Sequence, residues 1–218
     1  MGAVIQCRDL NVEIGDRLLL SEINLDVDRS QSVAIMGRSG SGKTTLLHAL
    51  SGLHSLTPGS LIVTGKDVGR LSSKERSYFR LHSIGLVLQF GELLPELTVA
   101  ENVGLQLALQ GKANPGRVNE LLDAVALSEH ANSFPGRLSG GELQRAAIAR
   151  AVAARPPVLL ADEPTGALDE DLAHLIVRLL ITTARAEHAA LVLVTHDPEI
   201  AAYADIQFKI RGKRLVPL

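Results

Sequence analysis

The feature that most constrains this chain is a glycine-rich segment at residues 37–45, which lies between two apolar segments. It fits the pattern G-x-x-x-x-G-K-[ST], the P-loop motif. Its four restricted positions are Gly37, Gly42, Lys43 and Thr44. Residues 32–36 before it form a short apolar run, typical of a strand buried on both faces, and residues 46–53 after it carry apolar side chains at helical spacing. The order of strand, glycine loop and helix predicts a loop that binds phosphate.

Each restricted position has a chemical reason. Glycine lets backbone N–H groups turn inward around phosphate oxygens, where a side chain would obstruct them, and the following helix adds the positive end of its dipole. We expect Lys43 to reach the β- and γ-phosphates and the Thr44 hydroxyl to bind Mg²⁺. The predicted phosphate-binding residues are Gly37, Arg38, Ser39, Gly40, Ser41, Gly42, Lys43, Thr44 and Thr45. A chance glycine-serine turn is the alternative, and the flanking strand and helix argue against it.

Composition limits the class of protein. The 218 residues suffice for a full core, and a formal net charge of −2 gives no broad basic surface for nucleic acid. A single cysteine, Cys7, excludes an internal disulfide, and we expect it to be buried in a first strand. No apolar run approaches the roughly 18 residues of a membrane span, and the N-terminus lacks a signal-peptide pattern. We therefore expect a cytosolic protein.

The periodicity predicts an α/β fold with an inserted helical segment. Strands are predicted at residues 3–14, 22–28, 32–36, 60–64, 84–89, 158–161, 191–195 and 205–210. Helices are predicted at residues 46–53, 73–82, 98–110, 117–127, 140–154, 170–187 and 198–203. We expect one domain over residues 1–218. Its mostly parallel core would comprise residues 1–91 and 156–218, with N-terminal antiparallel strands and an all-helical subdomain at residues 92–155.

Two carboxylates follow the apolar strand predicted at residues 158–161. An apolar strand that ends in a carboxylate is the Walker B arrangement, which holds Mg²⁺ at the carboxyl edge of a parallel sheet. We assign Asp162 to the metal, and Glu163 to accepting a proton from a water that attacks the γ-phosphate. A simple turn into Pro164 is the alternative explanation of these two residues. The upstream P-loop favours their catalytic interpretation.

The sequence Leu-Ser-Gly-Gly-Glu at residues 138–142 indicates a second anion site. We expect Ser139 to begin a helix whose first N–H groups are left uncovered by Gly140 and Gly141. Taken alone, the segment is better explained as an ordinary serine N-cap followed by flexible glycines. Its meaning therefore depends on the rest of the chain.

Six segments, taken in order, resemble the ATP-binding subunits of ABC transporters. They are residues 37–45, Gln89, residues 138–142, Asp162-Glu163, Leu168-Asp169 and residues 195–197. The resemblance covers essentially the whole chain. It implies a RecA-like P-loop NTPase core, ATP and Mg²⁺ as cofactors, and ATP hydrolysis as the activity.

The resemblance also implies roles for residues outside the P-loop. Gln89 would sense Mg²⁺, water and the membrane partner, and His196 would contact the γ-phosphate. Ser139 and Gly141 would bind ATP held by another copy, and Asp169 would cross the dimer. The implied partners are a second copy, in an ATP-sandwich dimer, and integral membrane permease subunits at the cytoplasmic face of the cell membrane. No nucleic acid partner is expected.

Two segments resemble one branch of the family more narrowly. Residues 93–103 and 163–169 are similar to subunits that serve lipoprotein release, macrolide or antimicrobial-peptide efflux, and cell division. In that branch the permease has a large extracytoplasmic domain, and the ATPase often transmits force instead of moving a solute. The resemblance places residues 93–103 beside the permease. An ordinary amphipathic helix with a proline-containing entry explains the same periodicity.

Two other functions account for parts of the sequence. A permease-free ABC ATPase that acts on ribosomes or DNA usually carries two fused cassettes or a long coiled-coil insertion, and neither is recognised here. A P-loop kinase or GTPase has no need of residues 138–142 or 195–197. We therefore predict ATP hydrolysis coupled to a membrane permease.

Three positions depart from the family's pattern. Residues 90–92 and Glu170 differ from the usual sequence, and Ile14 stands where an aromatic residue usually stacks on adenine. Stacking on a nucleic-acid base contributes about 1–3 kcal/mol. We therefore predict a weak preference for ATP over GTP, with Arg17 as the residue that would partly offset the loss. Measuring the Kd of both nucleotides tests this, and strongly ATP-selective binding would contradict it.

Overall fold

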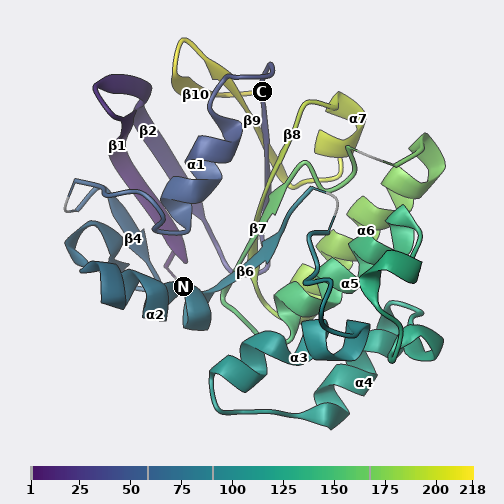
Figure 1. Cartoon of the computed structure of the whole chain (residues 1–218). Helices are drawn as coiled ribbons and strands as arrows, with labels where there is room; N and C mark the ends of the chain where they lie inside the picture. The colour runs from purple at the N-terminus through teal and green to yellow at the C-terminus, as the bar shows by residue number, and fades with distance from the viewer. Residues whose placement is uncertain (1, 58, 90, 167) are drawn as a thin grey trace.

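The computed structural model describes residues 2–57, 59–89, 91–166 and 168–218, which form two β-sheets covered by helices (Figure 1). The strands are β1 (Ile5–Ile14), β2 (Arg17–Val27), β3 (Ser32–Met36), β4 (Leu61–Val63), β5 (Lys66–Asp67), β6 (Ile84–Val87), β7 (Val158–Asp162), β8 (Ala190–Thr195), β9 (Ile206–Arg211) and β10 (Arg214–Pro217). The helices are α1 (Lys43–Leu50), α2 (Ser73–Ser83), α3 (Val99–Leu109), α4 (Pro115–Ala124), α5 (Gly140–Val152), α6 (Glu170–Ala186) and α7 (Pro198–Ala201), with short 3₁₀ turns η1 (Val68–Arg70), η2 (Ser128–His130) and η3 (Pro135–Arg137).

The larger sheet has six strands in the order β10-β9-β3-β8-β7-β6, and every pair except β9 with β10 is parallel. Its central strands are apolar on both faces, since every residue of β3 and β8 is buried. Parallel sheets need such sequences because crossover helices cover both faces. The prediction of a mostly parallel core is confirmed.

Alternate side chains of each central strand enter two separate cores. In β8, Leu191 and Leu193 pack on the side of α3, α4, α5 and α6. Val192 and Val194 pack on the opposite side, against α1 and the smaller sheet. Successive residues of a strand point to opposite faces of the sheet. A single strand of five or six residues therefore contributes side chains to both cores. The larger sheet is therefore packed between two hydrophobic cores.

The smaller sheet has the order β2-β1-β4-β5 and is antiparallel. Its polar and apolar residues alternate, as expected for a sheet with one solvated face. Cys7 is fully buried in β1, and burial raises the pKa of its thiol to about 12, so the thiol is not reactive. The predicted N-terminal antiparallel strands and the buried cysteine are confirmed.

Helices occupy the described residues between β6 and β7. Capping boxes start α3 and α5, formed by Thr98 with Glu101 and by Ser139 with Glu142, and each satisfies two backbone donors at the helix end. The helix α4 has Asn114 as its N-cap and Pro115 in its first turn. These helices pack beside α6 on one face of the larger sheet (Figure 1).

The sequence-based prediction missed two strands and made a third strand too short. β5 and β10 were missed, and β2 begins at Arg17 instead of residue 22. The start of β2 carries three consecutive leucines, so it lacks the alternation that marks a half-buried strand. β10 returns along β9 through Gly212 and Lys213, which both have positive φ, as in a tight hairpin turn.

No helix in the described parts of the chain combines the length and the apolar character that crossing a bilayer requires.

Gly85 in β6 lies where the sheet meets α5, and a Cβ there would collide with the backbone carbonyl of Ala151. Backbone cannot swing aside as a side chain can, so we expect Gly85→Ala to lower the free energy of unfolding by about 3 kcal/mol. Gly136→Ala is the matched control, because its Cβ would meet nothing within 4 Å. Denaturant unfolding of both variants tests this close approach, and equal stability would contradict it.

Candidate functional site

The carboxyl ends of β3, β7 and β8 meet at one edge of the sheet. Met36 is paired with Thr195, and Asp162 is paired with Val194. The residues that follow these strands therefore lie side by side, although they are far apart in the sequence. They border a cleft of about 530 Å³. Its lining residues are Leu19, Ser39, Gly40, Gly42, Lys43, Thr44, Thr45, Gln89, Glu163 and His196.

The loop after β3 uses its glycines for conformation and for space. Gly40 and Gly42 have φ values of +75° and +98°, in the region that favours glycine. A Cβ on Gly42 would lie 3.0 Å from the Leu20 side chain, and one on Gly37 would collide with the Ser41 hydroxyl. The fold therefore requires glycine at position 42, whereas a side chain at position 37 would force the Ser41 hydroxyl to rotate away.

The amino end of α1 differs from those of the other long helices. Its N-cap, Gly42, has no side chain to accept from the first N–H groups. In contrast, α2, α3, α5 and α6 are capped by the side chains of Ser72, Thr98, Ser139 and Asp169. Unsatisfied N–H groups at a helix N-terminus attract anions. The amino end of α1, which borders the cleft, is therefore suited to bind a phosphate group.

Lys43 turns back over the loop that precedes it. Its Nζ donates to the carbonyls of Gly37 at 3.0 Å and Arg38 at 3.5 Å, and lies 3.3 Å from Glu163 Oε1. The Lys43 and Glu163 side chains are only 9% and 16% exposed. A charge this far from water needs a partner, and Glu163 supplies it. An anionic ligand in the cleft would compete for the same ammonium group.

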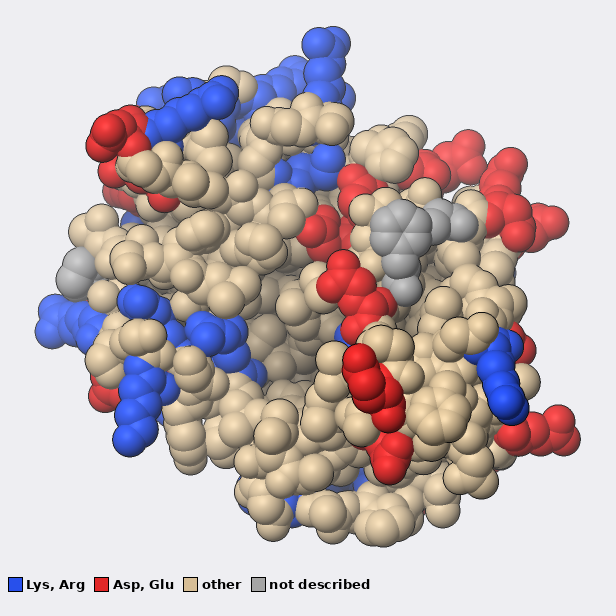
Figure 2. All heavy atoms as spheres, in the orientation of Figure 1, with Lys and Arg blue, Asp and Glu red and all other residues tan. Residues whose placement is uncertain are grey.

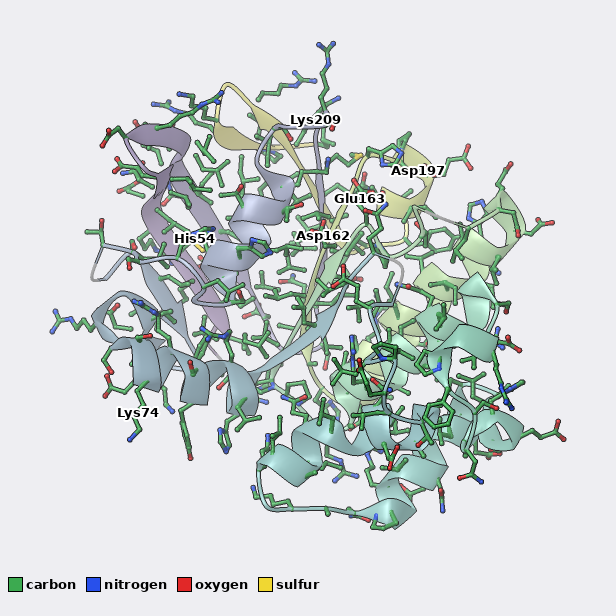
Figure 3. The ribbon with its side chains drawn as sticks, in the orientation of Figure 1. His54, Lys74, Asp162, Glu163, Asp197 and Lys209 are labelled. Carbon is green, nitrogen blue, oxygen red and sulfur yellow. The ribbon has the colours of Figure 1, made fainter. Side chains whose placement is uncertain are left out.

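Glu163 is held between the P-loop lysine and the histidine after β8. Figure 3 shows it close to Asp162, at the end of β7. Glu163 Oε2 lies 2.9 Å from His196 Nδ1 and accepts from the His196 backbone N–H at 3.3 Å. Its backbone has a φ of +44°, rarely adopted by residues other than glycine. The strain is offset by the hydrogen bond from its N–H to the Val194 carbonyl. This geometry directs the carboxylate into the cleft.

Asp162 has the character of a cation ligand. Its Oδ1 is buried and has no hydrogen-bond partner among the described residues. Burial raises the pKa of Asp162, and the nearby Thr44 hydroxyl opposes that shift. A buried carboxylate oxygen without a donor fits a hard divalent cation such as Mg²⁺. The donor set at this position is thus compatible with the metal that the sequence predicted.

Gln89 reaches the cleft from the end of β6. A Cβ on Gly166 would lie 3.1 Å from its Nε2, so the amide rests against the loop that follows β7. The cleft thus joins Gln89, Glu163 and His196, three residues that the sequence predicted for the site, and Asp162 directly precedes Glu163 in the chain.

Nine predicted residues are not lining residues of this cleft. Four of them, Gly37, Arg38, Ser41 and Asp162, belong to segments that border it, and the other five lie elsewhere. Ser139 caps α5 through Glu142, whose carboxylate accepts from the Ser139 backbone N–H at 2.7 Å. Asp169 caps α6 by accepting from Leu172 N–H, and Ile14 is half-exposed at the end of β1. None of these, nor Gly140 or Gly141, is a lining residue of the cleft. Within one chain, Ser139 behaves as the ordinary N-cap that the sequence also allowed.

Three features of the site region were not predicted. Leu19 lines the cleft, and no pattern in the leucine run of β2 marked it. Arg150, on α5, donates to the carbonyls of Gly91 and Glu92 at 2.9 and 2.8 Å, and no sequence pattern marked this contact. His174 lies beside two glutamates, Glu170 and Glu199, and no spacing in the sequence marked this cluster.

Comparison with known proteins agrees with the geometry of the cleft. The family model described as ABC transporter matches residues 20–166. The lipoprotein-releasing system ATP-binding protein LolD of Bordetella pertussis is 45% identical over 202 residues, which cover 91% of this chain and 87% of that protein. The ABC transporter ATP-binding protein YtrE of Bacillus subtilis is 40% identical, over 88% of this chain and 84% of its own length.

Solved structures give the same result. The ATP-binding cassette MJ0796, a dimer in a post-hydrolysis state bound to ADP and phosphate, has a TM-score of 0.84 and 33% identity, with 97% of this chain and 96% of that chain covered. CbiO1 from Clostridium perfringens, part of the transporter complex cbiONQ, has a TM-score of 0.89 and 27% identity, over 99% of this chain and 88% of that chain. The predicted RecA-like P-loop core and ABC ATPase are confirmed. The chain belongs to the ABC transporter family, as an ATP-binding subunit with ATPase activity.

Proposed function

We propose that this chain hydrolyses ATP with Glu163 as the base, forms a head-to-tail dimer around two ATP molecules, and drives a conformational change in a separate membrane permease. The observation that carries the proposal is the position of Glu163. Its carboxylate lies between Lys43 at 3.3 Å and His196 at 2.9 Å, at the end of a glycine loop that suits phosphate. A general base needs this kind of fixed placement near the reacting water.

In the proposed reaction, the residues of the cleft have different roles. The P-loop N–H groups and Lys43 bind the β- and γ-phosphates, which draws Lys43 away from Glu163. The freed Glu163 accepts a proton from the water whose oxygen attacks the γ-phosphorus, while the bond from that phosphorus to the bridging oxygen breaks. His196 keeps the carboxylate oriented through the contact at its Nδ1.

Three side chains would hold Mg²⁺ in this cleft: Thr44, Gln89 and Asp162. The orphaned buried oxygen of Asp162 supports that assignment. The cation would supply charge neutralisation to the phosphate oxygens when it is bound. Nothing else in the proposed mechanism depends on its geometry.

The dimer is proposed because one chain does not complete the site. Ser139, Gly140, Gly141 and Asp169 lie outside the cleft of their own chain, and the solved relative MJ0796 is dimeric. A head-to-tail arrangement closes with twofold symmetry and gives two equivalent sites. Each ATP would lie between the P-loop of one copy and Ser139 and Gly141 of the other. A monomer would then bind nucleotide and hydrolyse it very slowly.

The permease contact is proposed on both sides of α3. One apolar groove lies between α3 and α4, and includes Leu105, Ala108 and Val118. A second groove lies between α2, β6 and α3, and includes Leu105 and Leu109. Leu109 is 65% exposed, and the lower face over these helices carries few charged side chains (Figure 2). The exposed apolar side chains along these grooves support the proposal, because contiguous apolar surface is typical of interaction sites.

The similarity to LolD suggests the class of transporter. We propose a permease of the lipoprotein-releasing type, located in the cell membrane, with this chain at its cytoplasmic face. The proposed helical subdomain, residues 92–155, carries most of the contact surface. A permease-free ABC ATPase acting on ribosomes or DNA is the alternative. Recovery of an integral membrane permease with the chain from detergent extracts would favour the first function, and recovery of ribosomes or DNA the second.

Replacing the proposed base tests the chemistry. Glu163→Gln keeps the side-chain size but cannot accept the proton, so we expect ATP binding to persist and turnover to fall about 100-fold or more. We also expect the ATP-bound dimer to accumulate, measured by size-exclusion chromatography. Glu129→Gln, on η2, is the control. Normal turnover in Glu163→Gln would exclude the assigned base.

Replacing an exposed leucine tests the permease surface. Leu109→Glu places a charge in the apolar groove beside α3, so we expect permease recovery in a pull-down to fall while the ATPase rate of the isolated chain is unchanged. Leu175→Glu is the matched control, since Leu175 is 52% exposed on α6 and lines neither groove. Equal loss in both variants would contradict the assignment.

A further inference from the structure

A second cleft adjoins the nucleotide cleft, and it contains a mixed histidine and carboxylate cluster. The cleft has a volume of about 470 Å³, and shares Glu163 and His196 with its neighbour. Its outer part is lined by Glu170, His174 and Glu199. The candidate ligand atoms of these three side chains all lie within 4.8 Å of one another. No step of the proposed ATPase mechanism uses them.

The three side chains have the spacing of metal ligands. Glu170 and His174 are four residues apart on α6, which places them on one face of the helix, and Glu199 approaches from α7. His174 Nε2 lies 3.6 Å from Glu199 Oε2. Two ligands of a tetrahedral Zn²⁺ with bonds near 2.1 Å lie about 3.4 Å apart. Small rotations of the two exposed glutamates would complete such a geometry.

The orientation of His174 is fixed by a neighbour outside the cluster. Its Nδ1 lies 3.1 Å from the Tyr203 hydroxyl, which also accepts from the Arg178 guanidinium at 3.1 Å. The imidazole is therefore held with Nε2 directed at Glu199. Metal-bound histidines commonly use the second ring nitrogen in this way, to donate a hydrogen bond that fixes the tautomer. With a cation on Nε2, Nδ1–H would donate to Tyr203.

The charge of the region also favours a cation. Glu170 and Glu199 contribute two negative charges next to the His174 imidazole, and Asp197 lines the same cleft. Acidic side chains gather at the upper right of the molecule in Figure 2, and Asp197 and Glu163 lie on that side in Figure 3. Among these, His174 distinguishes the site, because imidazole selects transition metals over Mg²⁺ and Ca²⁺.

We propose that Glu170, His174 and Glu199 form a site for one Zn²⁺-class cation, with water as the fourth ligand. The cation would connect α6 to α7. These helices begin directly after Asp169 and Asp197, so the site would restrain two chain segments that border the nucleotide cleft. Metal binding is measured without nucleotide, and the proposal therefore stands apart from the proposed ATPase mechanism.

The test is a titration of the untagged, EDTA-treated chain with ZnCl₂ by calorimetry, without nucleotide, because phosphates bind metal ions. We expect one saturable site per chain. Loss of one carboxylate ligand, in Glu170→Gln or in Glu199→Gln, should weaken Zn²⁺ binding by about tenfold or more. Both glutamates are exposed, so these variants should fold like the parent, which melting in EDTA checks.

Two further measurements make the result decisive. Glu129→Gln, an exposed glutamate outside the cluster, should bind Zn²⁺ like the parent chain. Nitrogen NMR of the parent should show the His174 Nε2 signal shifting on addition of Zn²⁺, while Nδ1 stays protonated. Equal Zn²⁺ affinity in all variants, or no saturable site in the parent chain, would overturn the proposal.

Discussion

The parallel register of β3, β7 and β8 is the constraint on which the rest of the structure depends. Pairing of Met36 with Thr195, and of Asp162 with Val194, brings three strand ends to one edge. The register is fixed because a slip by one residue would move Leu191 and Leu193 out of one core and into the other. Packing on both faces of the sheet thus sets the geometry of the cleft.

The cleft contains a charged pair that the fold alone would not favour. Removing Lys43 and Glu163 from water costs several kcal/mol per ion, and their mutual attraction offsets that cost only in good geometry. The strained backbone of Glu163 adds to the cost. Such costs are typical of functional sites, where they place groups for a ligand. In this account, phosphate replaces Glu163 as the partner of Lys43, which makes the carboxylate available to water.

Local patterns predicted the parts of the site that depend on local chemistry. The glycines at positions 37 and 42, the strand before Asp162 and the serine cap at position 139 are each specified by neighbouring residues. Contacts between distant segments were not predictable in this way. Leu19 reaches the cleft, and His174 meets Glu199, only through tertiary packing. No periodicity or motif encodes those pairings.

The central claim is that each site is completed by a second copy, and mixing two inactive variants tests it most directly. Lys43→Met disables the P-loop, and Gly140→Asp places a charge at residues 139–141, where a Cβ meets only Leu168 at an ordinary 3.6 Å. Mixed dimers would keep one intact site, so an equal mixture should recover about a quarter of the parent ATPase rate by twofold symmetry. No recovery, at concentrations where the parent chain is active, would contradict the shared site.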